Sequence, residues 1–197
     1  MHREERVARM RVIAGTARGR LLRSARGAAL RPTTDRVRES WFSMVGHRVA
    51  GAAFLDLYAG TGAIGIEALS RGAARCTLVE KNRRCAECIR ENLKVLGELD
   101  PGTARVWQMD ALAAIAALHA AGEVFDLVFA DPPYGEQEAP GKTLTVLGAA
   151  GSLLARGALV TIQHSRRVPL PESTGLLRRV DERDYGDTRL SLYERTQ

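Results

Sequence analysis

From residue 51 onward, short and mostly apolar runs alternate with longer segments of mixed character. The runs occupy residues 54–58, 76–80, 104–108, 125–130 and 158–162, and helical periodicity is found near 64–70, 84–96, after 110 and at 144–154. Strands that read as nearly continuous apolar runs are buried on both faces, as parallel strands between helices are. The pattern therefore predicts a doubly wound α/β sheet.

Each end of the chain adds a smaller motif. Residues 176–183 and 189–194 flank the turn at 185–188, which predicts an antiparallel hairpin at the sheet edge. Residues 11–14 and 20–23 flank a loop from Gly15 to Gly19, which predicts a small N-terminal hairpin. The Pro-Thr-Thr-Asp segment at 32–35 then offers N-caps to a helix whose apolar face holds Val37, Trp41, Met44 and Val45.

Length and composition indicate a single cytoplasmic domain. The chain has 197 residues, 45% of them hydrophobic and 26% charged, with a charged N-terminus and without the run of about 18 apolar residues that a membrane span requires. Three clustered cysteines cannot link distant parts of the fold by disulfides. Cys85 and Cys88 form a C-x-x-C, which fits redox or zinc chemistry but also fits burial on one helix face. No second cysteine pair or suitably spaced histidine pair completes a set of four zinc ligands, so we expect no metal.

Positive charge is concentrated at the N-terminus. Residues 1–50 hold twelve arginines and four acidic residues, a charge of +8, whereas the rest of the chain carries −2. A basic arm on a near-neutral body is typical of proteins that dock on a phosphate backbone, but an arginine-rich solvated surface would have the same composition. Charge alone leaves both interpretations open.

A glycine loop follows the first strand of the sheet. Residues 60–65 read G-x-G-x-x-G, and Glu80 lies twenty residues beyond Gly60, a spacing that also fits a dinucleotide site. Asp56, four residues before the loop, argues against a dinucleotide, because a carboxylate there would repel a pyrophosphate. The same carboxylate would suit a ligand that carries an ammonium and a sulfonium. The predicted cofactor is therefore S-adenosylmethionine.

Four positions around this loop have predicted roles. Gly60 and Gly62 let the backbone approach the methionine part of the cofactor, and Glu80 accepts hydrogen bonds from the ribose hydroxyls. Asp110, after the third strand, is placed either to accept from the adenine amino group or to cap the following helix.

The fourth strand ends in Asp131-Pro132-Pro133-Tyr134. An exocyclic base nitrogen is a poor nucleophile unless hydrogen-bond acceptors bind its two protons and orient its lone pair toward the methyl group. The Asp131 carboxylate and the Pro132 carbonyl can be these acceptors. The prolines stiffen the turn, and the ring of Tyr134 can stack on a flipped or looped-out base. The tetrapeptide predicts methylation of a base amino group.

These features together resemble a known family. Arg31 to Ser40, Leu55 to Gly62, Glu67 to Ala73 and Asp131 to Tyr134 are similar to motifs of the bacterial RsmD family, over a region from about Arg11 to the C-terminus. The resemblance implies a Rossmann-like class I methyltransferase fold with a mostly parallel seven-stranded sheet, an antiparallel C-terminal hairpin and a small N-terminal β-hairpin and helix. It also implies transfer from S-adenosylmethionine to N2 of a guanine in 16S ribosomal RNA, within the small subunit or a late assembly intermediate, by a monomer.

The resemblance divides the chain into a basic extension, residues 1–50, for RNA contact and cofactor cover, and a catalytic domain, residues 51–197. The expected catalytic residues are Asp131, Pro132, Pro133 and Tyr134. The expected cofactor contacts are Thr34, Arg36, Asp56, Tyr58, Ala59, Gly60, Thr61, Gly62, Glu80, Lys81, Asp110, Ala111 and Asp131. The expected RNA contacts are Arg11, Arg18, Arg20, Arg23, Arg31 and Arg38.

Three alternatives stay open at this stage. The catalytic tetrapeptide would also serve adenine-N6 methylation of DNA, although no separate target-recognition domain is evident. The literal glycine motif would suit a nicotinamide-dependent oxidoreductase. The arginine arm would suit an RNA-binding module with a vestigial site.

Overall fold

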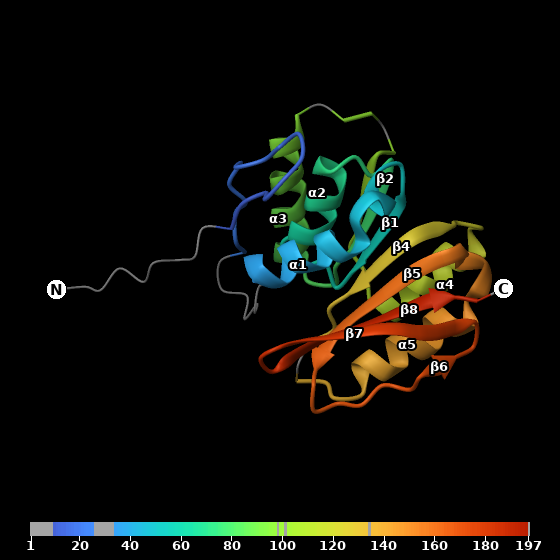
Figure 1. Ribbon diagram of the computed structural model, residues 1–197. Helices are drawn as coiled ribbons and strands as arrows, with labels where there is room; N and C mark the ends of the chain where they lie inside the picture. The colour runs from blue at the N-terminus through green and yellow to red at the C-terminus, as the bar shows by residue number, and fades with distance from the viewer. Residues whose placement is uncertain (1–9, 26–33, 98, 101, 134, 197) are drawn as a thin grey trace.

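A computed structural model describes residues 10–25, 34–97, 99–100, 102–133 and 135–196. Within them one sheet has the strand order β3-β2-β1-β4-β5-β8-β7-β6 (Figure 1). The strands are β1 (Ala53–Leu57), β2 (Arg75–Val79), β3 (Ala104–Trp107), β4 (Phe125–Ala130), β5 (Leu154–Ser165), β6 (Ser173–Thr174), β7 (Leu177–Tyr185) and β8 (Thr188–Arg195). The first five are parallel and the last three antiparallel, which confirms the doubly wound sheet and its C-terminal hairpin.

Two details differ from the prediction. An eighth strand, the two-residue β6, pairs with β7 at the outer edge of the expected seven. The helix predicted at 144–154 is α5 (Ala139–Ala149), which ends early and is followed by the short 3-10 helix η3 (Gly151–Leu153). Near the end of α5, Gly148 packs directly on β6, since a Cβ there would lie 2.5 Å from the Thr174 carbonyl oxygen.

Helices cover both faces of the sheet. The helices are α1 (Asp35–Val45), α2 (Ala63–Ser70), α3 (Arg83–Leu93), α4 (Ala111–Ala120) and α5, with the short 3-10 helices η1 (Gly46–Val49) and η2 (Lys94–Leu96). One apolar cluster joins α1, α2 and α3 to the sheet, and a second joins α4 and α5 to the opposite face. No helix in the described part of the chain has the length and apolar character that crossing a membrane requires.

Helix α1 is fastened to the sheet by its apolar face. Thr34 caps it by accepting a hydrogen bond from the Val37 amide at 3.3 Å. Trp41 is fully buried, and its indole N–H donates to Thr161 Oγ1 of β5 at 2.8 Å. The predicted helix and its cap are therefore confirmed, and Phe42 joins the expected apolar face.

The predicted N-terminal hairpin is a pair of short extended segments joined by a single bridge, between Arg11 and Leu21. The Leu22 amide donates to the Met10 carbonyl at 2.8 Å, so the two ends of the hairpin lie together. Its apolar side packs against α2, in a cluster made of Val12, Ala17, Leu22, Ala63 and Ile66. The hairpin is thus built onto the body of the molecule.

Candidate active site

The loops after β1, β2 and β4 lie side by side at the carboxyl edge of the sheet. Leu57 is in register with Val79 of β2 and Ala130 of β4, so the segments that begin at Tyr58, Glu80 and Asp131 start from adjacent positions. The Asp131 amide donates to the Leu57 carbonyl at 3.3 Å. This edge is where parallel sheets bind ligands, at the point where the strand order reverses.

The glycine loop turns sharply as it leaves β1. Tyr58 has φ 60° although it is not glycine, and Gly60 and Gly62 have φ 57° and 80°. The Tyr58 hydroxyl is hydrogen-bonded to Thr143 Oγ1 of α5 at 2.8 Å, which helps to hold this conformation. At Gly65 a Cβ would lie 2.7 Å from Leu78 Cδ2, so α2 packs directly on β2 at this glycine.

Asp56 lies beneath this loop and is almost completely buried. Its Oδ2 accepts a hydrogen bond from the Gly65 amide at 2.9 Å. Burial raises the pKa of the Asp56 carboxyl to about 8, the Gly65 amide opposes the shift, and the charges of Asp131 and Glu80 add to it. The carboxylates of Asp56, Glu80 and Asp131 therefore lie close enough together to interact electrostatically.

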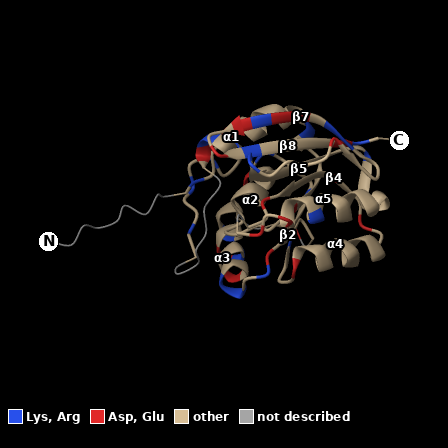
Figure 2. Ribbon diagram, turned by 90° about the horizontal axis from the view of Figure 1, so that it is seen from below, with Lys and Arg blue, Asp and Glu red and all other residues tan. Residues whose placement is uncertain are grey.

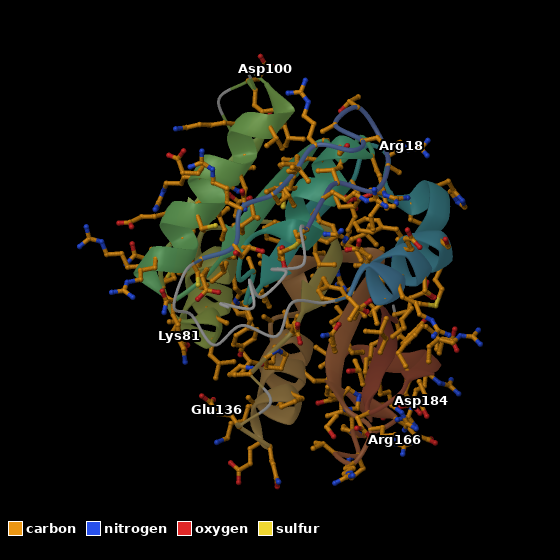
Figure 3. All side chains as sticks on the ribbon, turned by 90° about the vertical axis from the view of Figure 1, so that its left-hand side faces the viewer. Arg18, Lys81, Asp100, Glu136, Arg166 and Asp184 are labelled. Atoms are coloured by element: carbon orange, nitrogen blue, oxygen red, sulfur yellow. The ribbon has the colours of Figure 1, made fainter. Side chains whose placement is uncertain are left out.

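Glu80 fastens the glycine loop to the end of β2. One carboxylate oxygen accepts from the Gly60 amide at 2.9 Å and the other from the Asn82 amide at 2.7 Å. The next residue, Lys81, is exposed and forms an ion pair with Glu136 at 3.9 Å (Figure 3). The predicted cofactor positions on β1 and β2 thus belong to one connected turn region, while their contacts with a ligand stay predictions.

Asp110 caps α4. Its Oδ1 accepts from the amides of Leu112 and Ala113 at 2.9 and 3.2 Å. Of the two roles left open by the sequence, the structure shows the cap, and adenine recognition stays a prediction. Ala111 is buried in the core beside it.

The proposed catalytic turn begins beside the glycine loop. Asp131 is half-buried, Pro132 is buried and Pro133 is exposed. Tyr134 lies outside the described residues. Asp131 is close enough to Asp56 for its charge to raise the pKa of the Asp56 carboxyl. The turn therefore has the position that the sequence predicted, and its catalytic role stays a prediction.

Four of the arginines predicted to contact RNA are exposed on the N-terminal hairpin, namely Arg11, Arg18, Arg20 and Arg23. Figure 3 shows the Arg18 side chain extending outward from the body. Thr34 and Arg36 are exposed at the start of α1, which in Figure 1 begins on the side where β5 ends. Arg31 lies outside the described residues.

The prediction for Arg38 was wrong. Its side chain is fully buried on the face of α1 that meets the hairpin, where Nη2 donates to the Arg11 carbonyl at 2.5 Å and to Asp35 at 3.0 Å. Burial lowers the pKa of the Arg38 guanidinium while the Asp35 charge opposes that shift. The sequence around Arg38 is rich in arginine, and only the orientation of α1 determines which of these side chains is buried and which is exposed.

Sequence reasoning also missed two buried polar side chains. Glu67 of α2 accepts from the amides of Ile13 and Ala14, and Asn92 of α3 bonds to the backbone of Arg23 and Thr61. Asn92 carried a signal, because it occupies the apolar helix face that Cys85 and Ile89 define, where a polar residue requires hydrogen-bond partners.

The cysteines belong to the same packing. Cys85 and Cys88 are buried on α3, and Cys88 Sγ donates to the Arg23 carbonyl at 3.2 Å. Burial raises the pKa of the Cys85 thiol to about 11, which disfavours the reactive thiolate. Within the described residues no group of three or more His, Cys, Asp and Glu side chains is suited to hold a metal.

A doubly wound sheet with a glycine loop, three neighbouring carboxylates and an Asp-Pro-Pro turn at its carboxyl edge defines a Rossmann-like methyltransferase. Residues 10–194 match the model of the family described as "Conserved hypothetical protein 95". The chain belongs to this family, which is the RsmD family that the sequence motifs resemble.

Relatives align over almost the whole chain. YlbH of Bacillus subtilis is 39% identical over 186 residues, 94% of this chain and 99% of its own length. Ribosomal RNA small subunit methyltransferase D of Escherichia coli is 36% identical over 188 residues, 94% of this chain and 90% of its own length. The solved structure of Escherichia coli YhhF superposes with a TM-score of 0.80 at 34% identity, covering 95% of this chain and 98% of that one.

Proposed function

We propose that this protein transfers a methyl group from S-adenosylmethionine to the exocyclic N2 amine of a guanine in 16S ribosomal RNA of the small subunit. The relatives named as ribosomal RNA small subunit methyltransferases support the RNA class, and they align with both the hairpin and the catalytic body. The choice of N2 of guanine rests on the family resemblance and on the catalytic turn.

The crevice suits this cofactor by its charge. S-adenosylmethionine supplies an electrophilic methyl group on a sulfonium and also carries an ammonium. Glu80 and Asp131 place negative charge beside the glycine loop, and the neighbouring Asp56 carboxyl can lose its proton to a bound cation; the pyrophosphate of a nicotinamide dinucleotide would instead be repelled. The left-handed turn at Gly60 and Gly62 keeps the loop backbone free of side chains, so a ligand can approach it closely.

The catalytic turn holds the substrate amine. The Asp131 carboxylate and the Pro132 carbonyl accept hydrogen bonds from the two N–H groups, which aims the nitrogen lone pair toward the methyl group. No base with a shifted pKa is required before transfer, since the methylated nitrogen becomes acidic once the methyl is bound. The observation that carries the proposal is the placement of Asp131 next to the carboxylate-lined glycine loop.

The N-terminal hairpin provides the RNA contact in this proposal. The hairpin that carries the exposed arginines, which are blue in Figure 2, lies on the half of the molecule that includes α2 and α3 (Figure 1). Thr34 and Arg36, at the start of α1, cover the cofactor. Residues 1–50 therefore serve substrate and cofactor together, attached to the catalytic body at 51–197.

The test is methyl transfer to small ribosomal subunits purified from a strain that lacks this gene, with labelled S-adenosylmethionine and mass-spectrometric mapping of the RNA. The expected product is N2-methylguanine at one position of 16S RNA. Label in duplex DNA but not in the subunits would favour adenine-N6 methylation of DNA. Binding of NAD in preference to S-adenosylmethionine in a calorimeter would exclude the methyltransferase assignment.

The role of Asp131 is tested by Asp131→Ala. Loss of one acceptor for the amine should lower kcat by about 100-fold to 1,000-fold, a larger effect than the loss of its charge has on the binding of S-adenosylmethionine. Glu138→Gln is the matched control, because Glu138 is an exposed carboxylate of the same segment and its ion-pair partner, Lys142, has no predicted role. Full activity of Asp131→Ala would exclude Asp131 as the anchor of the amine.

A further inference from the structure

The arginine-bearing hairpin is fastened to three helices. Glu67 of α2, fully buried, accepts from the amides of Ile13 and Ala14 at 2.7 and 2.9 Å. Ser70 of α2 accepts from the Ala17 amide at 2.9 Å and donates to the Ala14 carbonyl at 2.7 Å. Together with Arg38 of α1, these contacts hold the middle of the hairpin on the body.

Asn92 of α3 makes a different attachment, because it also reaches the glycine loop. Its Oδ1 accepts from the Arg23 amide at 2.7 Å, and its Nδ2 donates to the Arg23 carbonyl at 3.0 Å. The same Nδ2 donates to the Thr61 carbonyl at 2.9 Å. One amide with 1% exposure thus bonds both to the end of the hairpin and to the loop between Gly60 and Gly62.

Thr61 is also contacted by the other end of the hairpin. Its hydroxyl donates to Met10 Sδ at 3.7 Å, and Met10 pairs through its carbonyl with the Leu22 amide. Both ends of the hairpin therefore meet at Thr61, one directly and one through Asn92. A shift of the hairpin on docking would change the hydrogen bonds that set the shape of the loop.

We propose that Asn92 is a positioning residue that couples RNA docking on the N-terminal hairpin to cofactor binding at the glycine loop. This inference rests on the proposed function, since it assumes that the hairpin contacts RNA and the loop holds S-adenosylmethionine. Coupling of this kind is reciprocal: RNA changes the affinity for the cofactor by the same factor as the cofactor changes the affinity for RNA.

The coupling is measured with S-adenosylhomocysteine as the probe, by its dissociation constant with and without small ribosomal subunits from a strain that lacks the gene. In the wild-type protein we expect the subunits to change this constant by about fivefold or more. In Asn92→Leu, which has a similar volume but no polar atoms, the change should fall below about twofold. A mere loss of stability would not produce this specific loss.

Two further variants keep the test decisive. Asn92→Asp retains the acceptor for the Arg23 amide but loses both Nδ2 donors, so it too should lose the coupling even if Asn92→Leu does not fold. Ser70→Ala is the matched control. It removes hydrogen bonds that hold the hairpin but do not involve the glycine loop, so this variant should keep the coupling even if its affinity for RNA falls.

The outcomes separate this inference from the proposed function. If the wild-type protein methylates the subunits but a folded Asn92 variant keeps the wild-type coupling, or the wild type has none, the inference is wrong. If the wild-type protein transfers no methyl group to the subunits, the proposed function itself is wrong.

Discussion

At the scale of single residues, the state of Asp56 determines how the crevice receives a cation. Burial raises the pKa of its carboxyl from an ordinary value near 3.8 to about 8. Between these values the folded chain holds a proton that the unfolded chain has released, so the contribution of Asp56 to stability is present at low pH and falls as pH rises toward 8. A bound sulfonium and ammonium favour the ionised form, so ligand binding below pH 8 should expel this proton.

The prediction is that S-adenosylmethionine binding at pH 7 releases most of one proton, because burial raises the pKa of the Asp56 carboxyl to about 8. Titration calorimetry in phosphate and in Tris measures it, because the two buffers differ in ionisation enthalpy. Asp56→Asn keeps an oxygen that can accept from the Gly65 amide and should abolish the release. Equal binding enthalpies in both buffers for the wild type would show that binding releases no proton and would contradict this prediction.

The residue types in the sequence correctly predicted where the acidic residues of the site lie. For Arg38, burial in the folded chain excludes the predicted role. Asp56, Glu80 and Asp131 meet at one edge as predicted, because Asp56 lies next to the last residue of β1 while Glu80 and Asp131 directly follow β2 and β4. Arg38 has the same chemistry as Arg36, yet one is enclosed and the other exposed. Their orientation depends on what packs against α1, which residue type does not indicate.

At the scale of elements, the N-terminal hairpin has little strand pairing of its own and is held mainly by hydrogen bonds from side chains of the body. One bridge joins its segments, whereas Glu67, Ser70 and Asn92 hold its backbone from two helices. The sequence predicted the hairpin from its alternation and glycines, but these attachments involve residues more than fifty positions away. Local pattern contains no information about partners at that separation.

We expect Arg18→Ala with Arg20→Ala to weaken RNA binding and to reduce its salt dependence. Loss of two phosphate contacts should lower the slope of log affinity against log salt by about 1.4 for single-stranded RNA. Binding to small subunits at several salt concentrations measures this slope. Arg156→Ala with Arg178→Ala removes two exposed arginines near the starts of β5 and β7, away from the carboxyl edge, and should leave the slope unchanged. An unchanged slope in the Arg18 and Arg20 variant would place the hairpin away from RNA.

At the scale of the whole molecule, α1 links the N-terminal extension to the centre of the sheet. Trp41 packs edge-on against Phe42, Phe54 and Phe129, and its indole N–H reaches Thr161. Ser40 is hydrogen-bonded to the Tyr185 hydroxyl at the end of β7. The extension and the catalytic body therefore share one core, and we expect them to unfold together.

Trp41→Phe should lower the free energy of unfolding by about 1–3 kcal/mol, because the buried Thr161 hydroxyl loses its partner and the smaller ring leaves a gap. Urea unfolding followed by circular dichroism and by fluorescence measures it. Trp107→Phe, at a half-buried site on β3, is the control and should cost less. Since the chain has two tryptophans, each variant keeps one fluorescent reporter. An early separate transition of α1 would contradict a shared core.

The sequence by itself determined the doubly wound sheet, the capped helix at residue 35, the glycine loop and the acidic positions at the strand ends. These depend on periodicity, on backbone preferences of glycine and proline, and on neighbours close in the chain. Only the tertiary structure decided that Arg38 turns inward, that Asp110 caps a helix, and that Glu67 and Asn92 fasten the hairpin to α2 and to the glycine loop. Those outcomes depend on which backbone N–H and C=O groups are buried by packing and therefore require a hydrogen-bond partner. Which groups these are is determined only once the chain has folded.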